Sequence, residues 1–138
     1  GKKFVDSDLE IEKFCGLSIP KIFETKGEKE FRKIENEILK KIGKQTGVVL
    51  STGGGAVLAE NDYEILKQNS EIYWIERNLN LLEMVGRPLS KNKDEIEKIY
   101  KIRKPIYEKT CDKTIENSDS AEASVQKILE DFHENSCY

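Results

Sequence analysis

The sequence is poor in the residues that build metal and nucleophile sites. It has a single histidine, His133, which excludes a histidine-based metal site and a Ser-His-Asp triad. Its three cysteines are odd in number, and none lies in a C-x-x-C pair. Such cysteines are typical of free thiols in a reducing compartment, and we therefore expect a cytoplasmic protein.

Long apolar runs and an excess of positive charge are also missing. No run approaches the roughly 20 apolar residues that a membrane span needs. The formal net charge is −3, which provides no electrostatic basis for binding nucleic acid. The length of 138 residues suffices for one core. We expect residues 1–138 to form a single domain that binds neither membranes nor nucleic acid.

Arginine is scarce as well, although positive charge is not. Only four of the 23 basic residues are arginine, and the rest are lysine. Arginine presents a planar fork of donors that binds carboxylate or phosphate through two parallel hydrogen bonds. The four arginines either mark anion-binding sites or belong to ordinary surface ion pairs; they are Arg32, Arg77, Arg87 and Arg103.

Short apolar runs alternate with amphipathic stretches along the chain. The runs predict strands at 3–5, 48–51, 72–75 and 113–116. The stretches predict helices at 18–27, 28–43, 61–68, 78–86, 94–107 and from 120 onward, with Gly27 and Gly43 as helix ends, Asn61 and Ser120 as caps, and a kink or break at Pro105. This alternation predicts an α/β fold with a parallel sheet.

Two polar features follow predicted strands, at the sheet edge where parallel α/β folds bind ligands. Asp6 and Asp8 end the first strand, and strand periodicity would point both side chains to the same side. Two such carboxylates can hold Mg²⁺ through water and accept a proton from a hydroxyl, although Asp also favours plain turns. Residues 52–55 contain three glycines, whose backbone can approach an anion or hydroxyl closely, or can simply form a strained turn.

Taken together, these motifs resemble the shikimate kinases. The matching segments follow the family order and spacing over essentially the whole chain: Phe4 to Asp8, Gly16 to Ile19 with Ile22-Phe23, Gly27-Glu28 with Phe31-Arg32 and Glu35, Thr52 to Gly55, Arg87-Pro88-Leu89, and Arg103 with Pro105 and Tyr107. The resemblance implies a three-layer, P-loop-kinase-like parallel sheet. It also implies that ATP and Mg²⁺ are used to phosphorylate the 3-hydroxyl of shikimate, a step in aromatic amino acid biosynthesis.

The resemblance assigns five residues to shikimate. Asp8 would take the substrate hydroxyl and act as the base or as the group that orients it. Arg32 and Arg103 would bind the shikimate carboxylate with their guanidinium forks. Gly54 and Gly55 would donate backbone N–H groups to the same substrate.

On the ATP side, the resemblance assigns Asp6 to Mg²⁺, held through water, and Arg87 to the ATP phosphates, where it would stabilise the transferring charge. Arg77 receives no role. The 138 residues contain no G-x-x-x-x-G-K-[ST] motif, nor the family's first strand and the helix after the motif. We therefore expect an N-terminally truncated domain whose 2-3-1-4-5 sheet misses its central first strand. Such a chain should be inactive alone and should self-associate.

Two alternatives to a truncated kinase stay open. The chain could be a non-catalytic remnant that still binds shikimate, or one part of a split enzyme completed by another chain. A related small-molecule kinase, such as gluconate kinase, is a weaker alternative. The glycine run at 52–55 and the pair formed by Arg32 and Arg103 argue against it.

Overall fold

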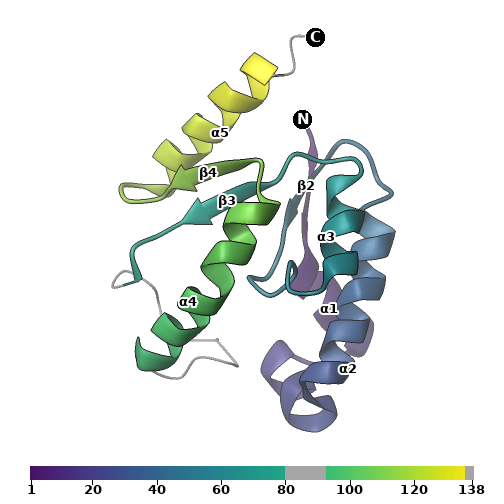
Figure 1. Cartoon of the computed structure of the whole chain (residues 1–138). Helices are drawn as coiled ribbons and strands as arrows, with labels where there is room; N and C mark the ends of the chain where they lie inside the picture. The colour runs from purple at the N-terminus through teal and green to yellow at the C-terminus, as the bar shows by residue number, and fades with distance from the viewer. Residues whose placement is uncertain (80–92, 136–138) are drawn as a thin grey trace.

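The computed structural model describes residues 1–79 and 93–135, in which strands and helices alternate (Figure 1). The elements in chain order are β1 (Lys3–Asp6), α1 (Ser7–Cys15), α2 (Ile19–Ile42), β2 (Val48–Ser51), α3 (Glu60–Lys67), β3 (Tyr73–Glu76), α4 (Lys93–Thr110), β4 (Lys113–Glu116) and α5 (Ala121–Asn135). Helices α1 to α3 gather beside β1 and β2, while α4 and α5 lie at β3 and β4. The predicted α/β class is confirmed.

The described strands form two separate two-stranded sheets, and both are parallel. β1 pairs with β2 from Lys3 opposite Val48 onward, and β3 pairs with β4 from Tyr73 opposite Lys113 onward. β2 and β3 are not hydrogen-bonded to each other. The interruption falls where the resemblance places the family's central strand, so β2 and β3 each keep an edge without a ladder partner among the described residues.

Helix α1 is an element that the sequence periodicity did not predict. Asp6 is its N-cap, and the Asp6 carboxylate oxygen Oδ1 accepts hydrogen bonds from the backbone N–H groups of Asp8 at 2.9 Å and Leu9 at 3.1 Å. The helix ends at Gly16, which has a left-handed φ of 66°. The expected strand alternation of Asp6 and Asp8 is therefore wrong, because Asp6 ends β1 and Asp8 lies in the first turn of a helix.

Gly27 interrupts its helix as predicted, whereas Pro105 does not end its helix. The break at Gly27 is confirmed, because its φ of 77° and ψ of 168° interrupt α2 with a conformation that favours glycine. Of the kink or break predicted at Pro105, the break is wrong, because α4 continues through this residue to Thr110. The predicted cap of α3 is also wrong: that helix begins at Glu60 with Ala59 at its N-cap position. The helix predicted at 78–86 falls mostly outside the described residues.

The main core lies between the first sheet and helices α1 and α2. It contains Val5 from β1, Ile11 from α1, and Ile22, Phe31, Ile38 and Ile42 from α2. Phe31, Ile38 and Ile42 recur at helical spacing along α2, so this helix buries one apolar face as an amphipathic helix does. A smaller cluster of Leu39, Ala56 and Leu66 joins α2, the end of the glycine loop and α3. The loop after β2 is therefore held against packed helices.

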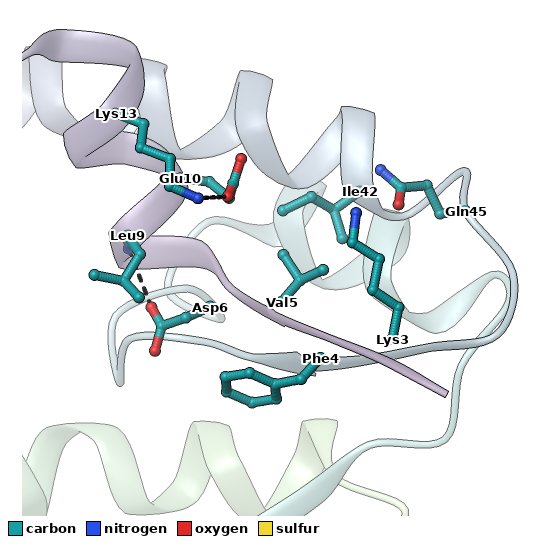
Figure 2. Close-up of a pocket in the computed structure, with 9 residues that line it drawn as sticks. All are labelled: Lys3, Phe4, Val5, Asp6, Leu9, Glu10, Lys13, Ile42 and Gln45. Atoms are coloured by element: carbon teal, nitrogen blue, oxygen red, sulfur yellow. Dashed lines mark hydrogen bonds and ion pairs between the residues drawn. The ribbon is translucent and has the colours of Figure 1, made fainter. Parts of the chain in front are cut away.

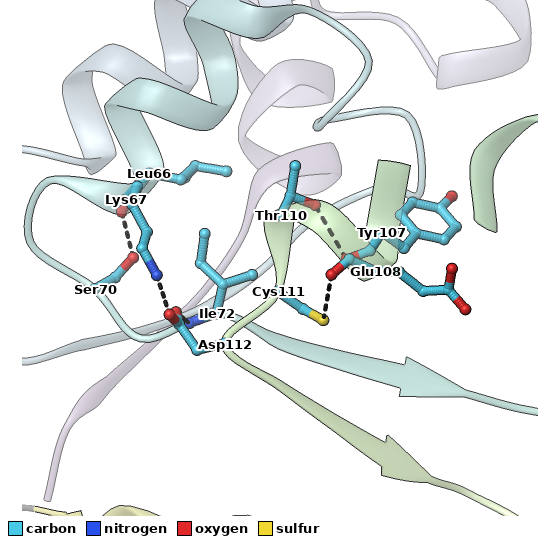
Figure 3. Close-up of polar contacts among 9 residues, drawn as sticks. All are labelled: Leu66, Lys67, Ser70, Ile72, Tyr107, Glu108, Thr110, Cys111 and Asp112. Carbon is cyan, nitrogen blue, oxygen red and sulfur yellow. Dashed lines mark hydrogen bonds and ion pairs between the residues drawn. The ribbon is translucent and has the colours of Figure 1, made fainter. Parts of the chain in front are cut away.

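Polar contacts hold β3 in place. The Asp112 carboxylate accepts a hydrogen bond from the N–H of Ile72 at 2.8 Å and pairs with Lys67 of α3 (Figure 3). The backbone N–H of Asp112 donates to the Ile72 carbonyl at 2.8 Å. The Tyr73 hydroxyl donates a hydrogen bond to Asp131 of α5 at 2.8 Å.

No helix in residues 1–79 and 93–135 combines the length and apolarity needed to cross a bilayer.

Candidate active site

The loop that follows β2 carries three consecutive glycines, Gly53 to Gly55. None of them has a positive φ; the described glycines that do are elsewhere in the chain. Backbone conformation therefore does not explain why glycine occupies these positions, and a strained turn is excluded as the reason. At Gly55 the explanation is space, because the Arg32 guanidinium lies where a Cβ atom would be, and at Gly53 and Gly54 a Cβ atom would make tight contacts with side-chain tips.

Each of these glycines faces a side chain that the sequence singled out. The facing groups are Asp8 Oδ1, 3.1 Å from the Cβ position of Gly53; Arg103 Nη1, 3.5 Å from that of Gly54; and Arg32 Nη1, 2.4 Å from that of Gly55. One carboxylate from α1 and two guanidinium groups from α2 and α4 thus converge on one loop. The sequence predicted the residue types, and the fold brings them together.

The glycine loop also directs its polar backbone groups. The carbonyls of Gly53 and Gly55 accept hydrogen bonds from Ala56 and Leu58, each at 3.1 Å. Within the described part of the chain, the N–H groups of Gly54 and Gly55 donate to no protein acceptor. Donors of this kind, beside two arginines, suit a ligand with oxygen acceptors.

Asp8 is a half-buried carboxylate in the first turn of α1. Burial raises the pKa of Asp8 above its ordinary value, the nearby carboxylates of Asp6 and Glu12 raise it further, and the Arg32 guanidinium opposes them. A carboxyl group with a raised pKa is better matched to proton transfer near neutral pH than an ordinary aspartate.

The Arg32 guanidinium is held by a buried acid. Its Nη1 lies 2.6 Å from Glu35 Oε2, and the Glu35 side chain is 1% exposed, whereas Arg32 itself is 21% exposed. A second, longer contact of 3.4 Å reaches Glu28. Glu35 belongs to the matching motif, but the resemblance gives it no role; its i, i+3 spacing from Arg32 is the sequence signal that predicts the ion pair.

Arg103 differs from Arg32 in its surroundings. It is half-buried on α4, and within the described residues its guanidinium forms no ion pair. Four residues further along the same helix, the Tyr107 hydroxyl donates to the carbonyl of Gly54. Tyr107, which belongs to the matching motif but received no role from the resemblance, thus contacts the glycine loop.

Asp6 contacts other parts of the chain than the glycine loop that Asp8, Arg32 and Arg103 face. One Asp6 oxygen caps α1, and the other points away from that helix (Figure 2). Asp6 also lines a pocket of about 270 Å³ between β1, α1 and the end of α2, which none of Asp8, Arg32 and Arg103 lines. In the described ranges, no three His, Cys, Asp or Glu residues cluster as metal ligands. Arg87 lies outside the described residues.

Comparison with known sequences identifies one family. The family model described as shikimate kinase matches residues 1–133. A shikimate kinase of Caldicellulosiruptor bescii is 38% identical over 137 residues, which covers 92% of this chain and 78% of that protein. A shikimate kinase of Thiobacillus denitrificans is 34% identical over 142 residues, covering 94% of this chain and 75% of that protein.

Solved structures agree with this match. The shikimate kinase from Acinetobacter baumannii in complex with shikimate aligns with a TM-score of 0.92 at 33% identity, over 100% of this chain and 82% of that one. The shikimate kinase from Aquifex aeolicus aligns with a TM-score of 0.82 at 36% identity, over 98% of this chain and 82% of that one. The two separated sheets thus occupy positions seen in longer chains.

Proposed function

This chain belongs to the shikimate kinase family, phosphotransferases that phosphorylate shikimate, and we propose that it contributes the shikimate-binding and base residues for transfer of the ATP γ-phosphoryl group to the 3-hydroxyl. The observation that carries this proposal is the convergence of Asp8, Arg32 and Arg103 on three successive glycines. A cationic pair opposite one carboxylate suits a ligand that has a carboxylate at one end and a hydroxyl at the other.

The two arginines bind the carboxylate of shikimate in unequal ways. Arg32 is held in place by Glu35, so little side-chain freedom is lost when it forms a bidentate pair. Arg103 lies on α4 and approaches the same glycine loop at Gly54. The N–H groups of Gly54 and Gly55 supply neutral donors to the substrate oxygens.

Asp8 accepts the proton of the 3-hydroxyl as that oxygen attacks phosphorus. Its raised pKa makes it a stronger base than an exposed aspartate. The Gly53 position leaves the Asp8 carboxylate open on its loop side, because a side chain there would lie about 3.1 Å from Oδ1.

The residues present fit a Mg²⁺ ion held through water. Asp6 and Asp8 are close enough for Asp6 to raise the pKa of Asp8, and a cation beside them would relieve that repulsion. When bound, Mg²⁺ would neutralise charge on the ATP phosphates. Asp6 would hold it through the oxygen that does not cap α1, and Arg87 would contact the ATP phosphates.

A polypeptide of these 138 residues should not transfer phosphate by itself. The ATP phosphates require a ring of backbone N–H groups and a lysine, and no Walker A motif occurs in the sequence. Residues 1–138 act as one domain in this proposal. A cytoplasmic location is consistent with the free thiols of Cys15 and Cys111.

Such a polypeptide should also self-associate through a second copy. Among the described residues, β2 and β3 each have an edge without a strand partner. Phe4 and Val49, which are register partners on one face of the first sheet, are 65% and 51% exposed. Ile75 on β3 adds a further apolar residue that is 43% exposed. Unpaired edges beside apolar surface favour strand exchange between copies.

One experiment tests these proposals together. The 138-residue chain and the same chain preceded by a strand, a Walker A loop and a helix are compared for shikimate binding by calorimetry, phosphorylation by product assay, and mass by light scattering. We expect shikimate binding by both, phosphorylation only by the extended chain, and association only of the short one. Robust activity from a monomer of 138 residues would show that the Walker A loop is dispensable. Shikimate binding without activity in the extended chain would favour a non-catalytic binding protein.

A further inference from the structure

Tyr107 connects helix α4 to the glycine loop. Its hydroxyl donates a hydrogen bond to the carbonyl oxygen of Gly54. Its ring also packs against Trp74 of β3, with the ring centroids 5.5 Å apart and the planes tilted by 38°. The phenol thus bridges β3 and the loop that follows β2, the two strands whose facing edges are not paired with each other.

This hydrogen bond orients a donor of the site. The Gly54 carbonyl and the Gly55 N–H belong to one planar trans peptide, so they point in opposite directions. When Tyr107 holds the carbonyl on the α4 side, the N–H of Gly55 is directed away from α4. Gly55 is the residue whose backbone lies against the Arg32 guanidinium. Loss of the Tyr107 hydroxyl would therefore free the rotation of this peptide, since glycine offers little steric resistance.

Tyr107 itself is well anchored. The carbonyl of Tyr107 accepts hydrogen bonds from the Cys111 N–H at 2.9 Å and from the Thr110 hydroxyl at 3.3 Å, at the end of α4 (Figure 3). Arg103 lies one turn earlier, and residues four apart share a helix face. Consistent with this, both Arg103 Nη1 and Tyr107 Oη lie within 3.5 Å of the Cβ position of Gly54.

We infer that Tyr107 is a positioning residue for shikimate binding, which sets the Gly54–Gly55 peptide so that its N–H meets the substrate while Arg103 approaches from the same helix face. The inference deepens the proposed function and rests on it. Tyr107 acts through the loop and does not touch the substrate in this account. Its contribution should consequently appear in shikimate affinity and in the rigidity of the loop.

The test compares two phenylalanine variants of the 138-residue chain. Tyr107→Phe keeps the ring against Trp74 and removes only the hydroxyl. Tyr100→Phe is the matched control, because it also removes one phenol hydroxyl from α4, but that hydroxyl donates to Glu76 at 2.5 Å. Backbone hydrogen exchange of residues 52–58, shikimate affinity by calorimetry, and thermal unfolding are measured for both.

We expect faster exchange in residues 52–58 and a shikimate affinity about 3- to 10-fold weaker for Tyr107→Phe, the scale of one neutral hydrogen bond. Tyr100→Phe should lower the unfolding temperature to a similar extent and leave both other measurements unchanged. Equal effects of the two variants on shikimate affinity would mean a general structural role and would overturn the inference, as would unchanged loop exchange in Tyr107→Phe. If the parent chain does not bind shikimate, the proposed function fails, while the exchange comparison still decides whether Tyr107 holds the loop.

Discussion

Replacing Gly55 with alanine should disturb the proposed shikimate site through Arg32 and not through the backbone. A Cβ atom at position 55 would lie 2.4 Å from both Nη atoms of Arg32 and 2.7 Å from its Cζ. Ordinary contacts begin at 3.4 Å, so the loop and the guanidinium must separate by 1.0 Å (3.4 − 2.4). The φ of Gly55 is not positive, and alanine therefore introduces no strain in the backbone itself.

The guanidinium cannot move away without cost. Its Nη1 lies 2.6 Å from Glu35 Oε2, and a shift of 1.0 Å directly away from the acid would stretch that contact to 3.6 Å, beyond a hydrogen bond. Breaking a buried ion pair completely costs about 3–5 kcal/mol. Because Arg32 stays nearby, we expect a partial loss of about 1–3 kcal/mol in the free energy of unfolding.

Shikimate binding should suffer as well, since a displaced fork no longer meets the carboxylate with two parallel bonds. A hydrogen bond to a charged group contributes about 1.5–3 kcal/mol, so Gly55→Ala should weaken shikimate about 10- to 150-fold. Calorimetric titration measures this loss, and thermal unfolding measures the stability change. Gly54→Ala is the comparison within the loop, and its loss of affinity should be smaller: its Cβ would meet only the tips of Tyr107 at 3.0 Å and Arg103 at 3.5 Å, which can yield by a few tenths of an ångström. If Gly55→Ala bound shikimate within twofold of the parent, the close approach to Arg32 would not matter for the site.

Four further outcomes are expected. Folding raises the pKa of Asp8, so its negative charge destabilises the fold at pH values above the raised pKa, and this cost is absent below pH 3.8. Asp8→Asn should therefore raise the unfolding temperature at pH 7 but not in acid, and it should lower kcat about 10²-fold or more in the extended chain. A lower unfolding temperature at pH 7 would contradict the burial argument. Arg103→Lys should weaken shikimate by about 1–3 kcal/mol in calorimetry with little change in stability, whereas Arg32→Lys should change both; equal affinities in all three proteins would remove the carboxylate assignment. Gly27→Ala should destabilise by about 1–3 kcal/mol in denaturant titration, because φ 77° and ψ 168° suit glycine alone; parent-like stability would show that α2 can run without the break. Asp6→Ala should lower the free energy of unfolding by about 1 kcal/mol because the helix cap is lost, whereas Asp6→Asn keeps a capping oxygen and should not. A shift of the Mg²⁺ dependence of turnover in Asp6→Asn would support the metal role, and an unchanged dependence would contradict it.

Local signals predicted much of the architecture. Short apolar runs located all four described strands to within one residue at each end, and β2 and β4 matched the prediction at both ends. The break at Gly27 was predictable because glycine both stops helices and adopts the φ found there. Helix α1 was missed because Asp6, Ser7 and Asp8 are equally typical of a turn, and their role as a helix start depends on where the strand ends.

The sequence by itself determined the kinds of groups in the site: scarce arginines, a pair of aspartates and a run of glycines, ordered with family spacing. Only the tertiary structure decided how they are used. It showed that the glycines provide room for Asp8 and Arg32, that Asp6 faces the helix it caps, and that Tyr107 reaches the loop from α4. The physical reason is that residue type and local spacing set propensity and chemistry, whereas the distance between Arg32 and Gly55 depends on how α2 packs against β2. Contacts between segments far apart in the chain follow from packing of the whole fold, which no local pattern encodes.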